Sequence, residues 1–233
     1  MGKYFGVGVG ALLAIPLGPR WLSGSVFHRK RYEWFGHRSS GILLLMAFPL
    51  AQIYPQSAWL AMGDWGQIFS DSLNWSSAIN YFALEMGTTA LAWIAVALTF
   101  ALSMKDGAPR LIVICLALIF SIVLKSLFNG MQFGADKTFA WLTPAAFWGV
   151  TLGSVMLAWL LQCSRRWLIY VALIALGAML VLVNFLPQNP YYLNSLREWK
   201  QGRLIHFNYL MSWLSWFWPI GAILSLLKAL KRG

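Results

Sequence analysis

The sequence predicts an all-α fold, namely a polytopic bundle of six to seven transmembrane helices with one short interfacial helix on the outer side. Hydrophobic residues make up 59% of the 233 residues and charged residues only 11%, whereas soluble domains average roughly 45–50% apolar and ~25% charged. One bilayer crossing requires ~20 apolar residues, and the chain contains seven apolar runs. We therefore expect a single integral membrane domain over residues 1–233, which excludes an ordinary soluble enzyme.

The seven expected segments follow one another with short polar connections. The first segment is short, contains glycines and ends in prolines, so it is a thin span, a re-entrant piece or a surface segment. This ambiguity is why we expect either six or seven crossings. The segments are Tyr4–Pro19, Gly41–Leu60, Tyr81–Ser103, Leu111–Asn129, Trp141–Gln162, Trp167–Leu186 and Phe207–Leu227.

The formal net charge of +11 indicates topology rather than binding to nucleic acid. Lys and Arg accumulate in the loops that stay on the cytoplasmic side of a membrane. When the 18 basic residues are sorted by segment, twelve fall on one side and five on the other, and Lys125 lies within a span. The side with twelve is expected to be cytoplasmic, which also places the C-terminus in the cytoplasm.

Two loops on the outer side are long enough to form structure. The loop between Trp59 and Tyr81 contains two aspartates and three tryptophans, and we expect it to rest on the membrane surface, because amphipathic rings prefer the headgroup level. The second loop opens with an Asn-Pro pair, closes at a glycine and has apolar residues at helical spacing. These features predict a short interfacial helix over Pro190–Gln201.

Gly149 and Gly153 have the spacing G-x-x-x-G within an apolar segment. This spacing lets another helix approach closely where lipid provides no hydrophobic driving force for association. The neighbouring helix can belong to the same chain or to a partner subunit.

The sequence contains no pattern for a cofactor, a metal ion or a catalytic group. Of the three histidines only His206 lies near a span, which excludes a haem bound by two histidines. The seven Asp and Glu residues are scattered and form no Glu-x-x-His or His-Glu-x-x-His motif. We therefore expect no cofactor, no metal and no catalytic residues.

Polar residues gather at one depth near the outer ends of several spans. Glu85 and Lys125 each lie about one helical turn from the outer end of their segments. The two segments are consecutive, so we expect them to be neighbours in the bundle. We therefore expect Glu85 and Lys125 to form an ion pair. Polar groups at such depth are functional candidates, unless they extend to the headgroups and satisfy each other. The other members of this expected cluster are Asn129, Asn184, Arg203, His206 and Asn208.

Several stretches of the chain resemble a known family. Leu50–Gln56, Phe139–Pro144, Val183–Tyr192, Gln201–Asn208 and Trp213–Pro219 are similar to the C-terminal membrane region of long VanZ-like proteins of Gram-negative bacteria. We find no counterpart of the N-terminal half that defines the VanZ-like domain. The resemblance implies a bacterial inner membrane and a link to cell-envelope phenotypes, including glycopeptide resistance. It carries over no catalytic residue.

Two functions remain open at this level. The first is a non-catalytic accessory or scaffolding subunit of a larger membrane assembly, favoured by the 14 tryptophans and the lack of an internal site. The second is an envelope protein that handles a lipid or lipid-linked substrate at the outer leaflet, favoured by Glu85 and Lys125. The expected partners are membrane lipids and protein subunits of a membrane complex.

Overall fold

The protein was analysed as a computed structural model that describes residues 32–35, 39–65, 80–185, 197, 199 and 205–231. Every regular element formed by these residues is a helix, which confirms the all-α part of the predicted fold. The elements are α3 (Ser39–Ala51), α5 (Tyr81–Ser103), α6 (Arg110–Phe133), η1 (Ala135–Lys137), α7 (Pro144–Leu160), α8 (Arg165–Phe185) and α10 (Ile205–Leu230).

In the described part of the chain, four helices are long and apolar enough to cross a membrane, namely α5, α6, α8 and the part of α10 from Phe207 to Leu230. Helix α3, with 13 residues, and helix α7, with 17 residues, are apolar but shorter. A helix of ~20 residues matches the ~30 Å thickness of the hydrocarbon layer. Length and composition thus support a membrane protein.

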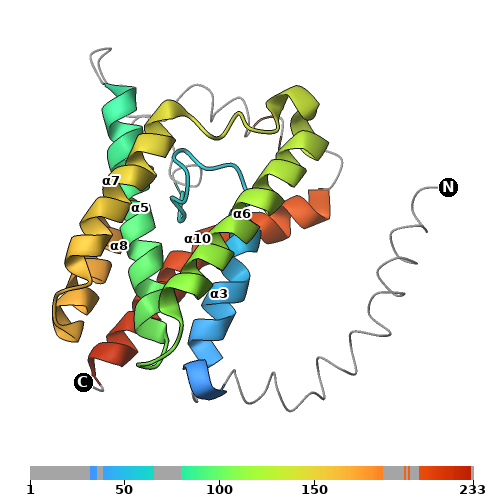
Figure 1. Ribbon diagram of the computed structural model, residues 1–233. Coiled ribbons are helices and arrows are strands. Elements are labelled where there is room, and N and C mark those ends of the chain that lie inside the picture. The colour runs from blue at the N-terminus through green and yellow to red at the C-terminus, as the bar shows by residue number, and fades with distance from the viewer. Residues whose placement is uncertain are drawn as a thin grey trace, which may run out of the picture.

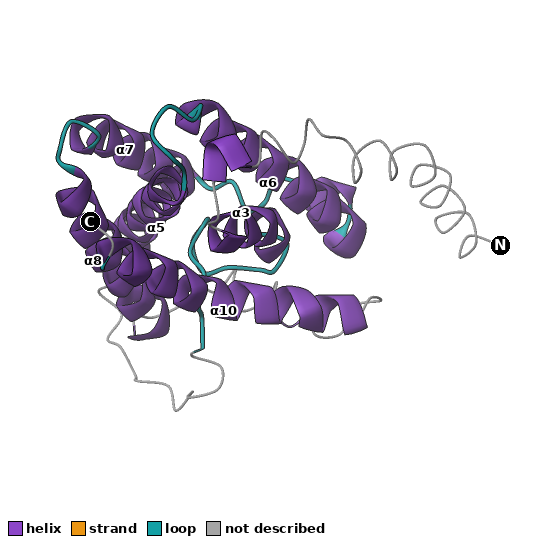
Figure 2. Ribbon diagram, turned by 90° about the horizontal axis from the view of Figure 1, so that it is seen from below, coloured by secondary structure: helices purple, strands orange, loops and turns teal. Residues whose placement is uncertain are grey.

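Helix α5 lies beside α7 and α8 (Figures 1 and 2) and contacts all five of the other α-helices named above. It packs mainly against α7 and α8 and also contacts α3, α6 and α10. Nearly every residue from Thr88 to Ser103 is buried. Helix α10 packs against α3 and α8, and α3 also contacts α6. The bundle therefore has α7, α5 and α8 on one side and α6 and α3 on the other, with α10 connecting the two groups (Figure 2).

Two glycines allow α7 to approach α5 closely. A Cβ atom added to Gly149 would lie 2.6 Å from the carbonyl oxygen of Met86, and one added to Gly153 would lie 3.0 Å from that of Ala90. Both distances are too short for a larger residue without displacement of the backbone. The G-x-x-x-G spacing therefore serves a contact between helices of the same chain.

The prediction of one span over Gly41–Leu60 is wrong beyond Ala51. Helix α3 ends at Ala51, and residues 52–65 continue as irregular backbone. Pro55 provides a local reason, because proline has no N–H donor and disfavours helical conformation in the residue before it. Leu60 and Gly63 then adopt positive φ angles of 68° and 84°, which a helix does not contain.

Residues 59–65 do not rest on the membrane surface as predicted. Trp59 is only 6% exposed and Asp64 only 4%, and the segment lies between α5 and α6 inside the bundle (cyan in Figure 1). Burial of its large apolar side chains favours this position, since each contributes roughly 1.5–3 kcal/mol. The remainder of that predicted loop, residues 66–79, lies outside the described residues.

Other predictions fall wholly or partly outside the described residues. The segment Tyr4–Pro19 is not among them, and of the predicted helix Pro190–Gln201 only Arg197 and Trp199 are described, both as helical. The span predicted from Trp141 becomes helical at Pro144, where the hydroxyl of Thr143 caps the helix by accepting from the backbone N–H of Ala146 at 3.0 Å.

Candidate functional site

The irregular segment 52–65 is held inside the bundle by hydrogen bonds from neighbouring helices. The side-chain amide of Asn184 donates to the carbonyl oxygen of Gly63 at 2.8 Å, and its Oδ1 accepts from the backbone N–H of Trp65 at 2.7 Å. The N–H of Gly63 donates to the carbonyl oxygen of Ser215 at 3.0 Å. Irregular backbone at membrane depth is stable only when protein groups pair its polar atoms in this way.

Lys125 of α6 binds the beginning of the same segment. Its Nζ donates to the carbonyl oxygen of Gln52 at 2.8 Å, to that of Tyr54 at 3.4 Å and to Oε1 of Gln56 at 3.3 Å. The residue is 3% exposed, so its charge is buried. We call these four residues the Lys125 centre.

The Lys125 centre lies deeper than the sequence predicts. Helix α6 continues to Phe133, one turn beyond the predicted end at Asn129, so Lys125 lies about two turns inside the helix. A lysine at this depth cannot extend easily to water, and the free-energy cost of burying its charge rises with depth.

The predicted ion pair between Glu85 and Lys125 is wrong. Glu85 instead accepts a hydrogen bond from the hydroxyl of Thr143 at 2.6 Å, and among the described residues Lys125 bonds only to the acceptors of its centre. The reason is packing. Because α6 contacts α3 more extensively than α5, Lys125 meets the chain that follows α3, whereas Glu85 meets the N-terminus of α7.

Aromatic rings surround the Lys125 centre. The ring centroid of Trp141 lies 6.0 Å from Lys125 Nζ, at the outer limit of a cation–π contact. Trp59 packs on Trp141 with ring centroids 4.9 Å apart, and Tyr54 makes an edge contact with Trp199 at 6.0 Å. Lys125, Tyr54 and Trp59 are all buried at this point of the bundle.

Several buried side-chain polar atoms of segment 52–65 and of α6 have no hydrogen-bond partner among the described residues. They include both side-chain polar atoms of Gln52, which is 0% exposed, the indole N–H of Trp59 and the hydroxyl of Ser126. An unpaired buried polar group costs about 1–3 kcal/mol. Such groups are uncommon in native structures and identify positions where a ligand or water can bind.

The structure brings together only part of the predicted polar cluster. Lys125 and Asn184 both bind segment 52–65. Asn208 is buried and donates to the carbonyl oxygen of Trp199 at 2.9 Å, next to Tyr54. Asn129 is half-buried and makes no hydrogen bond with these residues. Arg203 and the side chain of His206 lie outside the described part of the chain.

The residues that bind Lys125 or pack around it were not among the predicted site residues. Gln52, Tyr54, Gln56, Trp59 and Trp141 were all assigned to apolar segments or their ends. A usable signal exists in the run Gln52-Ile53-Tyr54-Pro55-Gln56, because two glutamines and a proline within five residues interrupt an otherwise apolar span.

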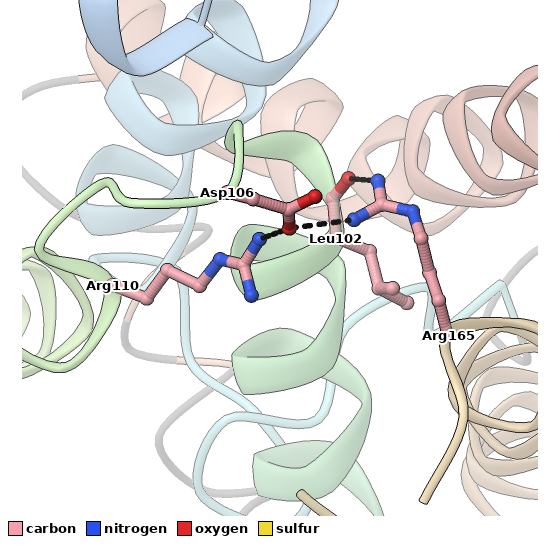
Figure 3. A network of polar contacts seen from close by, with 4 residues as sticks. All are labelled: Leu102, Asp106, Arg110 and Arg165. Atoms are coloured by element: carbon pink, nitrogen blue, oxygen red, sulfur yellow. Dashed lines mark hydrogen bonds and ion pairs between the residues drawn. The ribbon is translucent and has the colours of Figure 1, made fainter.

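The opposite end of the bundle carries exposed charges. Asp106 follows α5 and pairs with Arg110 at the start of α6 and, at 3.8 Å, with Arg165 at the start of α8 (Figure 3). Arg165 also donates to the carbonyl oxygen of Leu102 at 2.8 Å. We call this region the basic end. It joins three helices through contacts that water can reach.

The described residues contain no group of three or more His, Cys, Asp or Glu side chains that could hold a metal ion. The arrangement around Lys125 offers instead a buried amine that is cationic when protonated, and segment 52–65 contains unpaired N–H groups on Gln52 and Trp59. Its chemistry therefore suits binding of an acceptor group.

Comparison of the chain with protein-family models, curated proteins and solved structures gives no match. The similarity to VanZ-like proteins therefore stays a prediction.

Proposed function

We propose that this chain is a multi-pass protein of the bacterial inner membrane that binds a lipid or lipid-linked substrate at the Lys125 centre. One observation carries the proposal. Lys125 is buried about two turns inside a membrane-length helix, and its hydrogen bonds go to three neutral oxygens. Charged groups at membrane depth are rare and usually belong to functional sites.

The broken helix supports the same proposal. Helix α3 stops at Ala51, and the chain continues as buried irregular backbone over residues 52–65. In membrane transporters, interrupted helices of this kind form substrate sites, because their free backbone groups can bind polar ligands. In this chain the carbonyl groups of Gln52 and Tyr54, which follow the end of α3, accept hydrogen bonds from Lys125.

Native mass spectrometry of the full chain purified in mild detergent tests the proposal. We expect the wild-type chain to retain lipid and Lys125→Gln to lose most of it. Lys137→Gln is the matched control, because Lys137 is exposed near the same end of the bundle, and it should retain lipid as the wild type does. Equal lipid retention by all three proteins, or none by the wild type, would contradict the proposal.

For the topology we propose six or seven spans with the basic end in the cytoplasm. The positive-inside rule supports this orientation, since Lys105, Arg110, Arg165 and Arg166 all lie at that end. Single cysteines in place of Asp136 and Arg166, in a chain whose Cys115 and Cys163 are replaced by alanine, provide the test. An impermeant thiol reagent should label position 136 but not position 166 in intact spheroplasts. The reverse pattern would mean that the basic end faces away from the cytoplasm.

A second candidate is an accessory subunit of a membrane assembly. The observation that favours it is the uncovered face of α6, where eight large apolar side chains are exposed. Lipid or a partner helix could cover this face. The eight exposed residues are Leu111, Ile112, Leu116, Ile119, Phe120, Val123, Leu127 and Met131. A protein that co-purifies at fixed stoichiometry and is released by Ile119→Asn on this face would support the accessory role.

A further inference from the structure

We propose that the group bound at the Lys125 centre is an anionic oxygen of a lipid headgroup, which replaces the side-chain oxygen of Gln56 on Lys125 Nζ. This inference rests on the proposed function and specifies the chemistry of its substrate. It follows from the cation that Lys125 forms when protonated, from the nature of its three acceptors and from the unpaired donors of segment 52–65 and Ser126.

When it is protonated, Lys125 carries a positive charge that no carboxylate of the described residues contacts. All three acceptors of Lys125 Nζ are neutral amide oxygens, two from the backbone and one from a side chain. Neutral dipoles compensate a buried charge only in part, whereas a paired opposite charge compensates it fully when the geometry is good. An anionic ligand would complete the pair.

Gln56 is the acceptor that can be exchanged. The oxygens of Gln52 and Tyr54 belong to the backbone of a buried segment, whereas Gln56 is half-buried and binds through its flexible side chain. Its bond to Lys125 is 3.3 Å long, and its own amide N–H reaches the carbonyl oxygen of Ala51 only at 3.5 Å. Rotation of this side chain would open one coordination position on Nζ at little cost.

The unpaired groups of segment 52–65, together with that of Ser126, which follows Lys125 in α6, are mainly donors. The amide N–H of Gln52, the indole N–H of Trp59 and the hydroxyl of Ser126 have no acceptor among the described residues. Phosphate and carboxylate groups present several acceptor oxygens at once. The remaining unpaired atom, Oε1 of Gln52, would suit a hydroxyl group of the same headgroup.

Lipid titration followed by native mass spectrometry tests this inference on the full chain. The probes are phosphatidylglycerol, which has an anionic phosphate and a hydroxyl-bearing headgroup, and diacylglycerol, which has the same tails without phosphate. We expect Lys125→Gln to weaken phosphatidylglycerol binding about tenfold or more, because a hydrogen bond to a charged group is lost. Diacylglycerol binding should not change, and Lys137→Gln should behave as the wild type does.

Gln56→Ala tests directly whether an anionic oxygen replaces the Gln56 side-chain oxygen on Lys125 Nζ. This variant also provides a test of the inference if Lys125→Gln does not fold. Since the competing oxygen is removed, we expect this variant to bind phosphatidylglycerol several-fold more tightly than the wild type. Gln162→Ala is the control, because Gln162 is exposed at the basic end. Unchanged or weaker binding by Gln56→Ala would overturn the exchange.

The outcomes separate this inference from the proposed function. If Lys125→Gln weakens the binding of both lipids equally, the anionic group is overturned, while lipid binding at the Lys125 centre stands. If no lipid binds but inorganic phosphate raises the melting temperature of the wild type and not of Lys125→Gln, the anion site stands and its lipid source is overturned. If neither lipid nor phosphate has an effect, both proposals are wrong.

Discussion

The two ends of the bundle accommodate their cations in opposite ways. At the basic end, Arg110 and Arg165 pair with the carboxylate of Asp106, whose side chain is 89% exposed. At the other end, Lys125 is buried and bonds only to neutral oxygens of the chain that follows α3. Exposed ion pairs contribute little to stability, whereas a buried cation must be matched by groups that the fold positions for it.

This difference separates the two ends in function as well. The contacts at the basic end join α5, α6 and α8, and other charged residues could replace them at small cost, because water solvates each partner. The Lys125 centre depends on the irregular path of residues 52–65. We therefore expect substitutions at the two ends to differ strongly in their effect on the free energy of unfolding.

The largest effect is expected for Lys125→Met, which should lower the free energy of unfolding by about 2–4 kcal/mol. The backbone oxygens of Gln52 and Tyr54 lose their donor, at about 1–3 kcal/mol for each buried unpaired group, while relief from burying a charge offsets part of this. Titration with dodecyl sulphate in mixed micelles measures the change. The exposed control Lys137→Met should stay within about 0.5 kcal/mol, and an unchanged unfolding midpoint for Lys125→Met would contradict the structure.

Asn184→Ala should lower the free energy of unfolding by about 1–3 kcal/mol in the same titration. This variant removes the side chain that pairs with Gly63 and Trp65 and leaves their backbone groups without a partner. Asn129→Ala is the matched control near the same end, since Asn129 makes no such bonds, and it should have little effect. Similar losses for both asparagines would mean that residues 52–65 are not held as described.

A double-mutant cycle sharpens the comparison within the Lys125 end. Because Glu85 binds Thr143 and Lys125 binds segment 52–65, the effects of Glu85→Gln and Lys125→Met should add within about 0.5 kcal/mol. A direct ion pair would instead make the double variant much less destabilised than the sum. Such a non-additive result would support the ion pair between Glu85 and Lys125 that the sequence predicts.

The smallest effect is expected at the basic end. Asp106→Asn should change the free energy of unfolding by less than about 0.5 kcal/mol, because exposed ion pairs are weak and are screened by salt. The same dodecyl sulphate titration at low and high salt measures it. A loss as large as that of Lys125→Met would remove the distinction between the two ends.

The sequence was most informative where the relevant signal is local. The predicted segment Tyr81–Ser103 coincides with α5, and Asn80 caps this helix by accepting from the backbone N–H of Ala83. Long apolar runs between polar residues predict helices of this kind, because each backbone hydrogen bond forms within the helix itself. The end of α3 was missed, because an apolar run does not reveal where irregular backbone becomes more stable than helix.

The candidate site could be predicted only in part. Lys125 and Asn184 were identified because polar residues in apolar segments are conspicuous, but their partners were not. Lys125 is separated from Gln52 by 73 residues along the chain, and Asn184 from Gly63 by 121. No periodicity or spacing encodes contacts over such separations.

The sequence by itself thus determined the helical class, the four membrane-length helices of the described residues and the polar residues that need partners, since these follow from hydrophobicity and local hydrogen bonding. Only the tertiary structure decided that segment 52–65 folds into the bundle and that Lys125 binds it rather than Glu85. The physical reason is that a buried charge pairs with whichever acceptors the packing of α3 and α6 places within reach, and this packing depends on the whole bundle.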